Sequence, residues 1–64
     1  MERISTKQAA EMLNINEVGV RVLLQQEKLP IGYAVKLPQS SRWTYYIFLE
    51  LTEAYVKKVE QGNL

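Results

Sequence analysis

The segment GYAVKLPQSSRWTYYIF, residues 32–48, decides how this chain folds. Apolar and aromatic residues recur with a period of two over residues 33–37 and again over residues 43–47. Such alternation, rich in aromatic and β-branched residues, indicates strands. Residues 38–41 between the two runs are proline, glutamine and two serines, which are typical of a turn. The segment therefore predicts a β-hairpin with a polar tip.

One face of this hairpin must pack on other elements, because a lone hairpin is not stable in water. We assign the inward face to Trp43, Tyr45 and Ile47, and the outward face to the residues that alternate with them. On this assignment Trp43 is a core residue. The opposite assignment stays open, because Tyr46 and Phe48 are also apolar.

The composition excludes several kinds of site. The chain of 64 residues contains no cysteine and no histidine, so it lacks disulfides, thiolate metal ligands and the commonest general base. A single small domain needs its apolar residues for its core. We therefore expect neither an enzyme, a metal site, a cofactor nor a small-molecule substrate. The chain also has no apolar run long enough for a membrane span and no secretory leader at its start, which predicts a cytoplasmic protein.

Two short helices are expected before the hairpin. Ser5 and Gln8 have the spacing of a capping box, which predicts a helix over about residues 6–13. Asn16 is a good N-cap for a second helix over about residues 17–27, with Ile15 as the apolar plug of the turn between them. The buried stripe of the second helix is assigned to Val20, Leu23 and Leu24, continued by Leu29.

A third helix is expected after the hairpin, over about residues 49–60. Leu51, Ala54, Tyr55 and Val59 have helical spacing and are assigned to its buried face. Gln61-Gly62-Asn63 should end the helix, and Leu64 should be frayed. Two helices joined by a few residues are either a helix-turn-helix or a plain helical hairpin, and spacing alone does not separate these two.

Three stretches resemble known winged helix-turn-helix proteins. ISTKQAAEMLNI is similar to the first helix and turn of the excisionase-like and MerR-like families, VRVLLQQEKLP to the end of their second helix, and SSRWTYYIF to their second wing strand. The resemblance implies one α+β domain over residues 1–64. It comprises a helix-turn-helix over about residues 5–29, a β-hairpin wing over about 32–48 and a C-terminal helix over about 49–60.

The chain departs from these families at two places. They often carry glycine at the position of Glu27, and their second helix often opens with polar or basic residues where this chain has Glu17, Val18 and Gly19. The second departure weakens base recognition by that helix. Because MerR-like regulators also need a long dimerisation helix, which 64 residues do not accommodate, we expect the excisionase-like type.

The resemblance implies binding to double-stranded DNA and association with the nucleoid. An excisionase from a phage or mobile element bends DNA and helps an integrase to excise it, acting beside that integrase or beside further copies of itself. A small transcriptional regulator is a second possibility in the same class. A protein-interaction module, such as a phage antirepressor or adaptor, is the alternative from another class, favoured by the net charge of only +1.

The candidate DNA contacts form three groups. Basic and amide side chains can reach phosphates. Arg21 and Gln25 lie four residues apart on a helix that would enter the major groove, where they can bind bases. Exposed valines can touch thymine methyl groups. The second-helix group is Asn16, Val18, Arg21, Val22, Gln25, Gln26 and Lys28. The wing group is Lys36, Gln39, Ser40, Ser41 and Arg42, and the first-helix group is Lys7 and Gln8.

Overall fold

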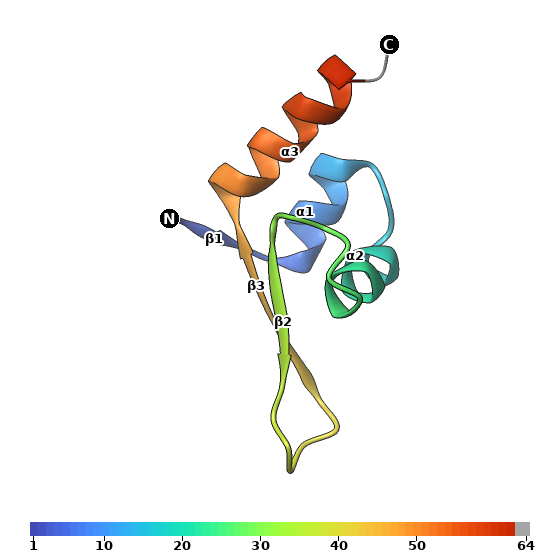
Figure 1. Ribbon diagram of the computed structural model, residues 1–64, viewed down its shortest axis with the longest axis vertical. Coiled ribbons are helices and arrows are strands. Elements are labelled where there is room, and N and C mark those ends of the chain that lie inside the picture. The colour runs from blue at the N-terminus through green and yellow to red at the C-terminus, as the bar shows by residue number, and fades with distance from the viewer. Residues whose placement is uncertain (63–64) are drawn as a thin grey trace.

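Three helices and one three-stranded antiparallel sheet make up this α+β protein, whose computed structural model describes residues 1–62. The elements are β1 (Arg3–Ile4), α1 (Thr6–Leu13), α2 (Glu17–Gln25), β2 (Gly32–Lys36), β3 (Trp43–Phe48) and α3 (Leu49–Gly62). Figure 1 shows the helices gathered around one end of the sheet, while the hairpin of β2 and β3 extends well beyond them. The molecule is accordingly long, with extents of 44 × 22 × 17 Å.

Both N-terminal helices begin at the predicted caps. The Ser5 hydroxyl accepts a hydrogen bond from the Gln8 amide, and the Gln8 side chain accepts one from the Ser5 amide, each at 3.0 Å. The Asn16 side chain accepts from the Gly19 amide at 2.6 Å. The first two helices therefore use polar side chains to satisfy backbone groups that a helix N-terminus leaves unpaired.

The second helix ends two residues earlier than predicted, in a Schellman motif. The Lys28 amide donates to the Leu23 carbonyl at 2.9 Å, and the Glu27 amide donates to the Leu24 carbonyl at 3.1 Å. Glu27 itself adopts a left-handed backbone conformation, with φ of 57°. Glycine is the usual residue at this position of the motif, because a side chain is strained there.

The sheet has one strand more than the sequence predicted. Its order is β1-β3-β2, so β3 is the central strand, and β1 pairs Arg3 with Phe48 and Ile4 with Ile47. The predicted two-stranded hairpin is present, and β1 adds a third strand to it. On its other side β3 pairs with β2, from Gly32 opposite Ile47 to Lys36 opposite Trp43.

The core lies between the helices and one face of the sheet. Ile47 is 1% exposed and Tyr45 is half-buried, so the predicted inward face is confirmed for these two residues. Trp43 is 36% exposed and lies outside the core, which makes its prediction as a core residue wrong. The buried apolar side chains are Ala9, Ala10, Val20, Leu24, Leu29, Ile31 and Ile47. Ile15, predicted to plug the turn, is exposed.

The buried face of α3 differs from the predicted stripe. Thr52 is fully buried, and its hydroxyl donates to the Phe48 carbonyl at 2.8 Å, which satisfies the only polar atom of that side chain. Leu51 and Tyr55 are half-buried and pack on the core as expected. Ala54 and Val59 are exposed, so their assignment to the core was wrong. Asn63, expected to end the helix with Gln61 and Gly62, and Leu64, expected to be frayed, lie outside the described residues.

The strain at Glu27 yields a stability prediction. Glu27→Gly should raise the free energy of unfolding by about 0.5–1 kcal/mol, because glycine adopts the left-handed conformation without the clash that a side chain has there. Glu27→Gln, which removes the charge and keeps the strain, is the control and should leave stability nearly unchanged. Urea unfolding followed by circular dichroism measures both variants. A gain of the same size in Glu27→Gln would show that charge, not backbone strain, is responsible.

The second stability prediction concerns Gly32, where β2 approaches β3 too closely for a side chain. A Cβ atom at Gly32 would lie 1.9 Å from the Tyr46 carbonyl oxygen and 2.9 Å from Ile47 Cα. Gly32→Ala should therefore destabilise the protein by about 3 kcal/mol or more, since backbone atoms of the central strand must move. Gly19→Ala is the matched control. Its nearest contact would be Asn16 Oδ1 at 3.2 Å, the end of a side chain and not backbone, and alanine is the better helix former, so Gly19→Ala should cost much less stability than Gly32→Ala. If thermal melts show that Gly32→Ala and Gly19→Ala lose equal stability, the close approach of β2 to β3 is not the cause.

Candidate functional site

The exposed surface of α2 carries apolar and polar residues side by side. Val18 and Val22, four residues apart, are 62% and 41% exposed, in agreement with their predicted position outside the buried stripe. Gln26 and Lys28, which follow the helix, are also exposed. These four side chains are accessible to a partner without rearrangement.

Arg21 is less free than the sequence suggested. Its guanidinium lies 3.3 Å from a carboxylate oxygen of Glu17, one turn earlier, and both side chains are less than half exposed. The same oxygen accepts a hydrogen bond from the Thr6 hydroxyl at 3.5 Å, which links the pair to α1. This ion pair holds the guanidinium along the helix until a stronger acceptor replaces the carboxylate.

Gln25 joins α2 to the sheet instead of pointing into solvent. Its side-chain amide donates a hydrogen bond of 2.7 Å to the Tyr45 hydroxyl on β3. The predicted exposed pair of Arg21 and Gln25 is therefore corrected: both side chains are half-buried and both have partners. The bond to Tyr45 instead fixes the direction of the hairpin relative to α2.

Three further candidates are occupied or poorly placed. Asn16 and Gln8 act as helix caps through the side-chain oxygens described above. Lys7 is exposed, but it lines a shallow depression together with Glu11 and Glu17. Two carboxylates beside the ammonium group do not favour a phosphate at the start of α1.

The hairpin tip, defined as residues 36–42, is basic and locally ordered. The Ser40 amide donates to the Leu37 carbonyl, and the Arg42 amide donates to the Ser40 hydroxyl, both at 3.0 Å. Lys36 and Arg42 are exposed, and the tip contains no acidic residue. Gln39 and Ser41 are exposed as well, whereas Ser40 is half-buried and shapes the turn. Four of the five predicted wing residues are thus presented together at the far end of the molecule (Figure 1).

A cleft of about 430 Å³ lies between the end of α2 and the strands of the hairpin. Trp43 and Gln25 line it, and Glu27 and Pro30 border it on the side of α2. Trp43 was predicted to be buried, and the strand alternation gave no sign that it would lie at the edge of the helical body. It is a candidate functional residue that the sequence did not identify.

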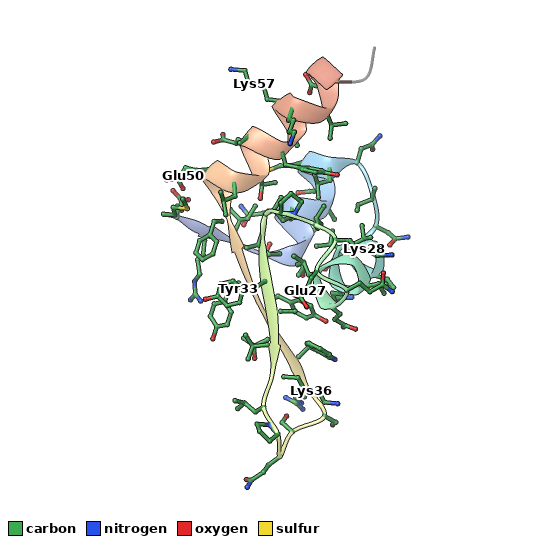
Figure 2. The ribbon with its side chains drawn as sticks, in the orientation of Figure 1. Glu27, Lys28, Tyr33, Lys36, Glu50 and Lys57 are labelled. Carbon is green, nitrogen blue, oxygen red and sulfur yellow. The ribbon has the colours of Figure 1, made fainter. Side chains whose placement is uncertain are left out.

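The opposite face of the sheet carries an aromatic cluster. The rings of Tyr33 and Tyr46 stack with centroids 5.1 Å apart, and Phe48 lies 6.2 Å from Tyr33. The guanidinium of Arg3 lies 5.1 Å from the centre of the Tyr46 ring. Figure 2 shows Tyr33 on the side of the sheet away from α2. These side chains cover the face that no helix covers, and they contact one another.

An apolar groove of about 380 Å³ lies between the turn that joins α1 to α2 and α3. It is lined mainly by Leu13, Ile15, Leu29, Tyr55 and Val59. In the described part of the chain there is no group of three acidic side chains placed to hold a metal ion. Nor is any helix within residues 1–62 long and apolar enough to cross a membrane.

The bond between Gln25 and Tyr45 can be tested by removing one hydroxyl. Tyr45→Phe should lower the free energy of unfolding by about 1 kcal/mol, because it leaves the Gln25 amide without its partner in a partly buried position. Tyr33→Phe removes the same group from a half-exposed side chain and should cost nothing measurable. If the two variants unfold at the same urea concentration, the bond between α2 and β3 does not contribute to stability.

Comparisons of the chain with family models, with curated proteins and with solved structures gave no match. Its function is therefore inferred from the placement and chemistry of the residues described above.

Proposed function

We propose that this protein binds double-stranded DNA as a small winged helix-turn-helix, with α2 toward the major groove and the hairpin as the wing. One observation carries the proposal: the hairpin tip, which is basic and free of acids, extends beyond the helical body on the side of α2 (Figure 2). A chain this short gains little core from residues 36–42, since most of them are exposed. A binding role accounts for this extension.

The tip has the chemistry of a backbone contact. Lys36 and Arg42 supply two positive charges, while Gln39 and Ser41 supply exposed hydrogen-bonding groups. Such side chains bind phosphate oxygens and the edges of the minor groove with little dependence on sequence. The wing therefore contributes mainly sequence-independent affinity.

The exposed face of α2 has the chemistry of a base contact. Its exposed valines match thymine methyl groups, and Gln26 offers an amide. Arg21 can also take part, because an exposed ion pair between residues four apart stabilises a helix by only about 0.3–0.5 kcal/mol. A guanine or phosphate at the groove replaces the Glu17 carboxylate at small cost. Whatever sequence preference exists should reside in this helix.

A single copy should bind weakly. Lys28, Lys36 and Arg42 are the exposed cations near the proposed surface, and three neutralised phosphates correspond to a log–log salt slope of about −3. Useful affinity then requires neighbouring copies or a partner protein on adjacent DNA. Of the DNA-binding roles, the excisionase-like one, acting beside an integrase, agrees best with this requirement, and a small transcriptional regulator is the other.

A second candidate function is binding to a protein, as an antirepressor or adaptor does. The exposed Val18 and Val22 and the apolar groove beside α3 favour it. Glu17 at the start of α2 also favours a protein over a polyanion. The two functions differ in a direct binding measurement, because only the first requires affinity for duplex DNA at low salt.

The DNA-binding proposal is tested with Arg42→Ala. The variant should lose affinity for specific and random duplexes by about the same factor. The magnitude of its log–log salt slope should fall by about 1, because one phosphate contact is lost. Fluorescence anisotropy of labelled duplexes at several salt concentrations measures both quantities. Arg21→Ala, in the same titrations, should reduce binding to a preferred site more than binding to random DNA.

Lys57→Ala is the matched control, since it removes the same charge from α3, at the other end of the molecule (Figure 2). It should leave both the affinity and the salt slope close to those of the wild type. Equal effects of Lys57→Ala and Arg42→Ala would mean that only net charge matters. Absence of wild-type binding at low salt would replace the DNA-binding proposal with the protein-binding one.

A further inference from the structure

Trp43 is the single tryptophan of the chain, and its position is unusual for so large an apolar side chain. It begins β3, directly opposite Lys36, where the hairpin leaves the helical body. It is 36% exposed and does not belong to the core, although a chain of this size has few apolar groups to spare. Packing alone does not explain an indole at this place.

The residues around Trp43 define the direction in which it is accessible. Successive residues of a strand point to opposite faces, so Lys36 shares a face with Ala34, which packs on the core. By the strand pairing Trp43 lies on this same face, toward α2, and it lines the cleft between α2 and the hairpin. The exposed part of the indole therefore faces the concave side of the molecule.

We propose that the indole of Trp43 packs against a deoxyribose of bound duplex DNA while the ammonium group of Lys36 binds the adjoining phosphate. The inference rests on the DNA-binding function proposed above and adds a specific contact residue to it. A sugar presents C–H groups beside a charged phosphate, and Trp43 with Lys36 presents an apolar surface beside a cation. The apolar indole thus matches the sugar, and the neighbouring ammonium group matches the neighbouring phosphate.

Two features of the cleft make the sugar a better partner than a base. An apolar side chain that separates stacked bases must protrude, whereas Trp43 lines a cleft beside α2 and exposes only 36% of its surface. Glu27 borders the cleft on the side of α2 and repels a phosphate there. The DNA strand is thereby directed to the hairpin side, toward Lys36.

The aromatic cluster on the other face of the sheet does not compete for this role. Tyr33 and Tyr46 stack on each other, and Arg3 lies over the second ring, so these groups already have partners. Their face also points away from α2, which carries the proposed base contacts (Figure 2). Tyr33 also borders the cleft, but its ring stacks on Tyr46 on the opposite face of the sheet. It therefore serves as a matched control, an exposed aromatic residue of the same hairpin whose ring is directed away from α2.

Because Trp43 is the only tryptophan, its fluorescence reports on this contact directly. We expect the quenching of wild-type fluorescence by neutral acrylamide to fall by about half when a saturating 20-base-pair duplex is added, since the sugar would cover the exposed indole. Binding is followed independently by the anisotropy of a dye on the duplex. Anisotropy that rises while quenching stays unchanged would overturn the contact and leave the DNA-binding function intact.

Variants supply the second test. Trp43→Ala should weaken duplex binding about tenfold, Trp43→Phe should retain most of the affinity, and Tyr33→Ala should bind like the wild type. Circular dichroism establishes that each variant is folded; should Trp43→Ala unfold, Trp43→Phe and the quenching measurement still decide. Equal losses in Trp43→Ala and Tyr33→Ala would overturn the inference. A wild type that fails to bind duplex DNA would overturn the proposed function and this contact with it.

Discussion

The pairing of Ile47 with two other strands at once holds this fold together. Ile47 lies opposite Ile4 of β1 on one side and opposite Gly32 of β2 on the other, and its side chain is buried against the helices. Because Gly32 has no Cβ, its strand can approach β3 closely enough for this arrangement. The N-terminus, the hairpin and α3, which begins directly after β3, are therefore all placed by the two pairings of Ile47 and their neighbours.

This arrangement explains which parts of the fold could be predicted from the sequence. The caps at Ser5 and Asn16 act over three residues, and strand alternation acts over two, so both patterns are visible in short stretches. The two residues of β1 are too few for any periodicity, and their pairing partner lies more than forty residues away. Alternation correctly gave the face on which Trp43 lies. Alternation could not predict how deeply Trp43 is buried, because the burial of this side chain depends on where the helical body ends.

The candidate site was predicted less well than the fold, for a related reason. Polar side chains near helix ends and turns were assigned to DNA contacts, Gln8 and Asn16 in addition to their predicted roles as caps, yet several of them bind the protein itself. Gln8 and Asn16 cap helices, Gln25 bonds to Tyr45, and Ser40 shapes the hairpin tip. A domain with a small core uses such local bonds for its own stability. Within residues 1–62, neither an ion pair nor a contact with an aromatic ring occupies the charged groups of Lys36 and Arg42, which is why both remain available.

The distribution of charge connects the fold to the proposed function more closely than the net charge does. A value of +1 gives almost no general attraction to a polyanion. The tip, however, carries two cations and no acid, while α3, at the other end of the molecule, carries three acids (Glu50, Glu53 and Glu60) and two cations (Lys57 and Lys58) (Figures 1 and 2). If the protein binds DNA as proposed, a molecule of 44 Å with its acid-free cationic end at the tip would orient in the field of DNA with that tip foremost. The hairpin that Ile47 and Gly32 attach to the core would then give a nearly neutral protein a defined direction of approach.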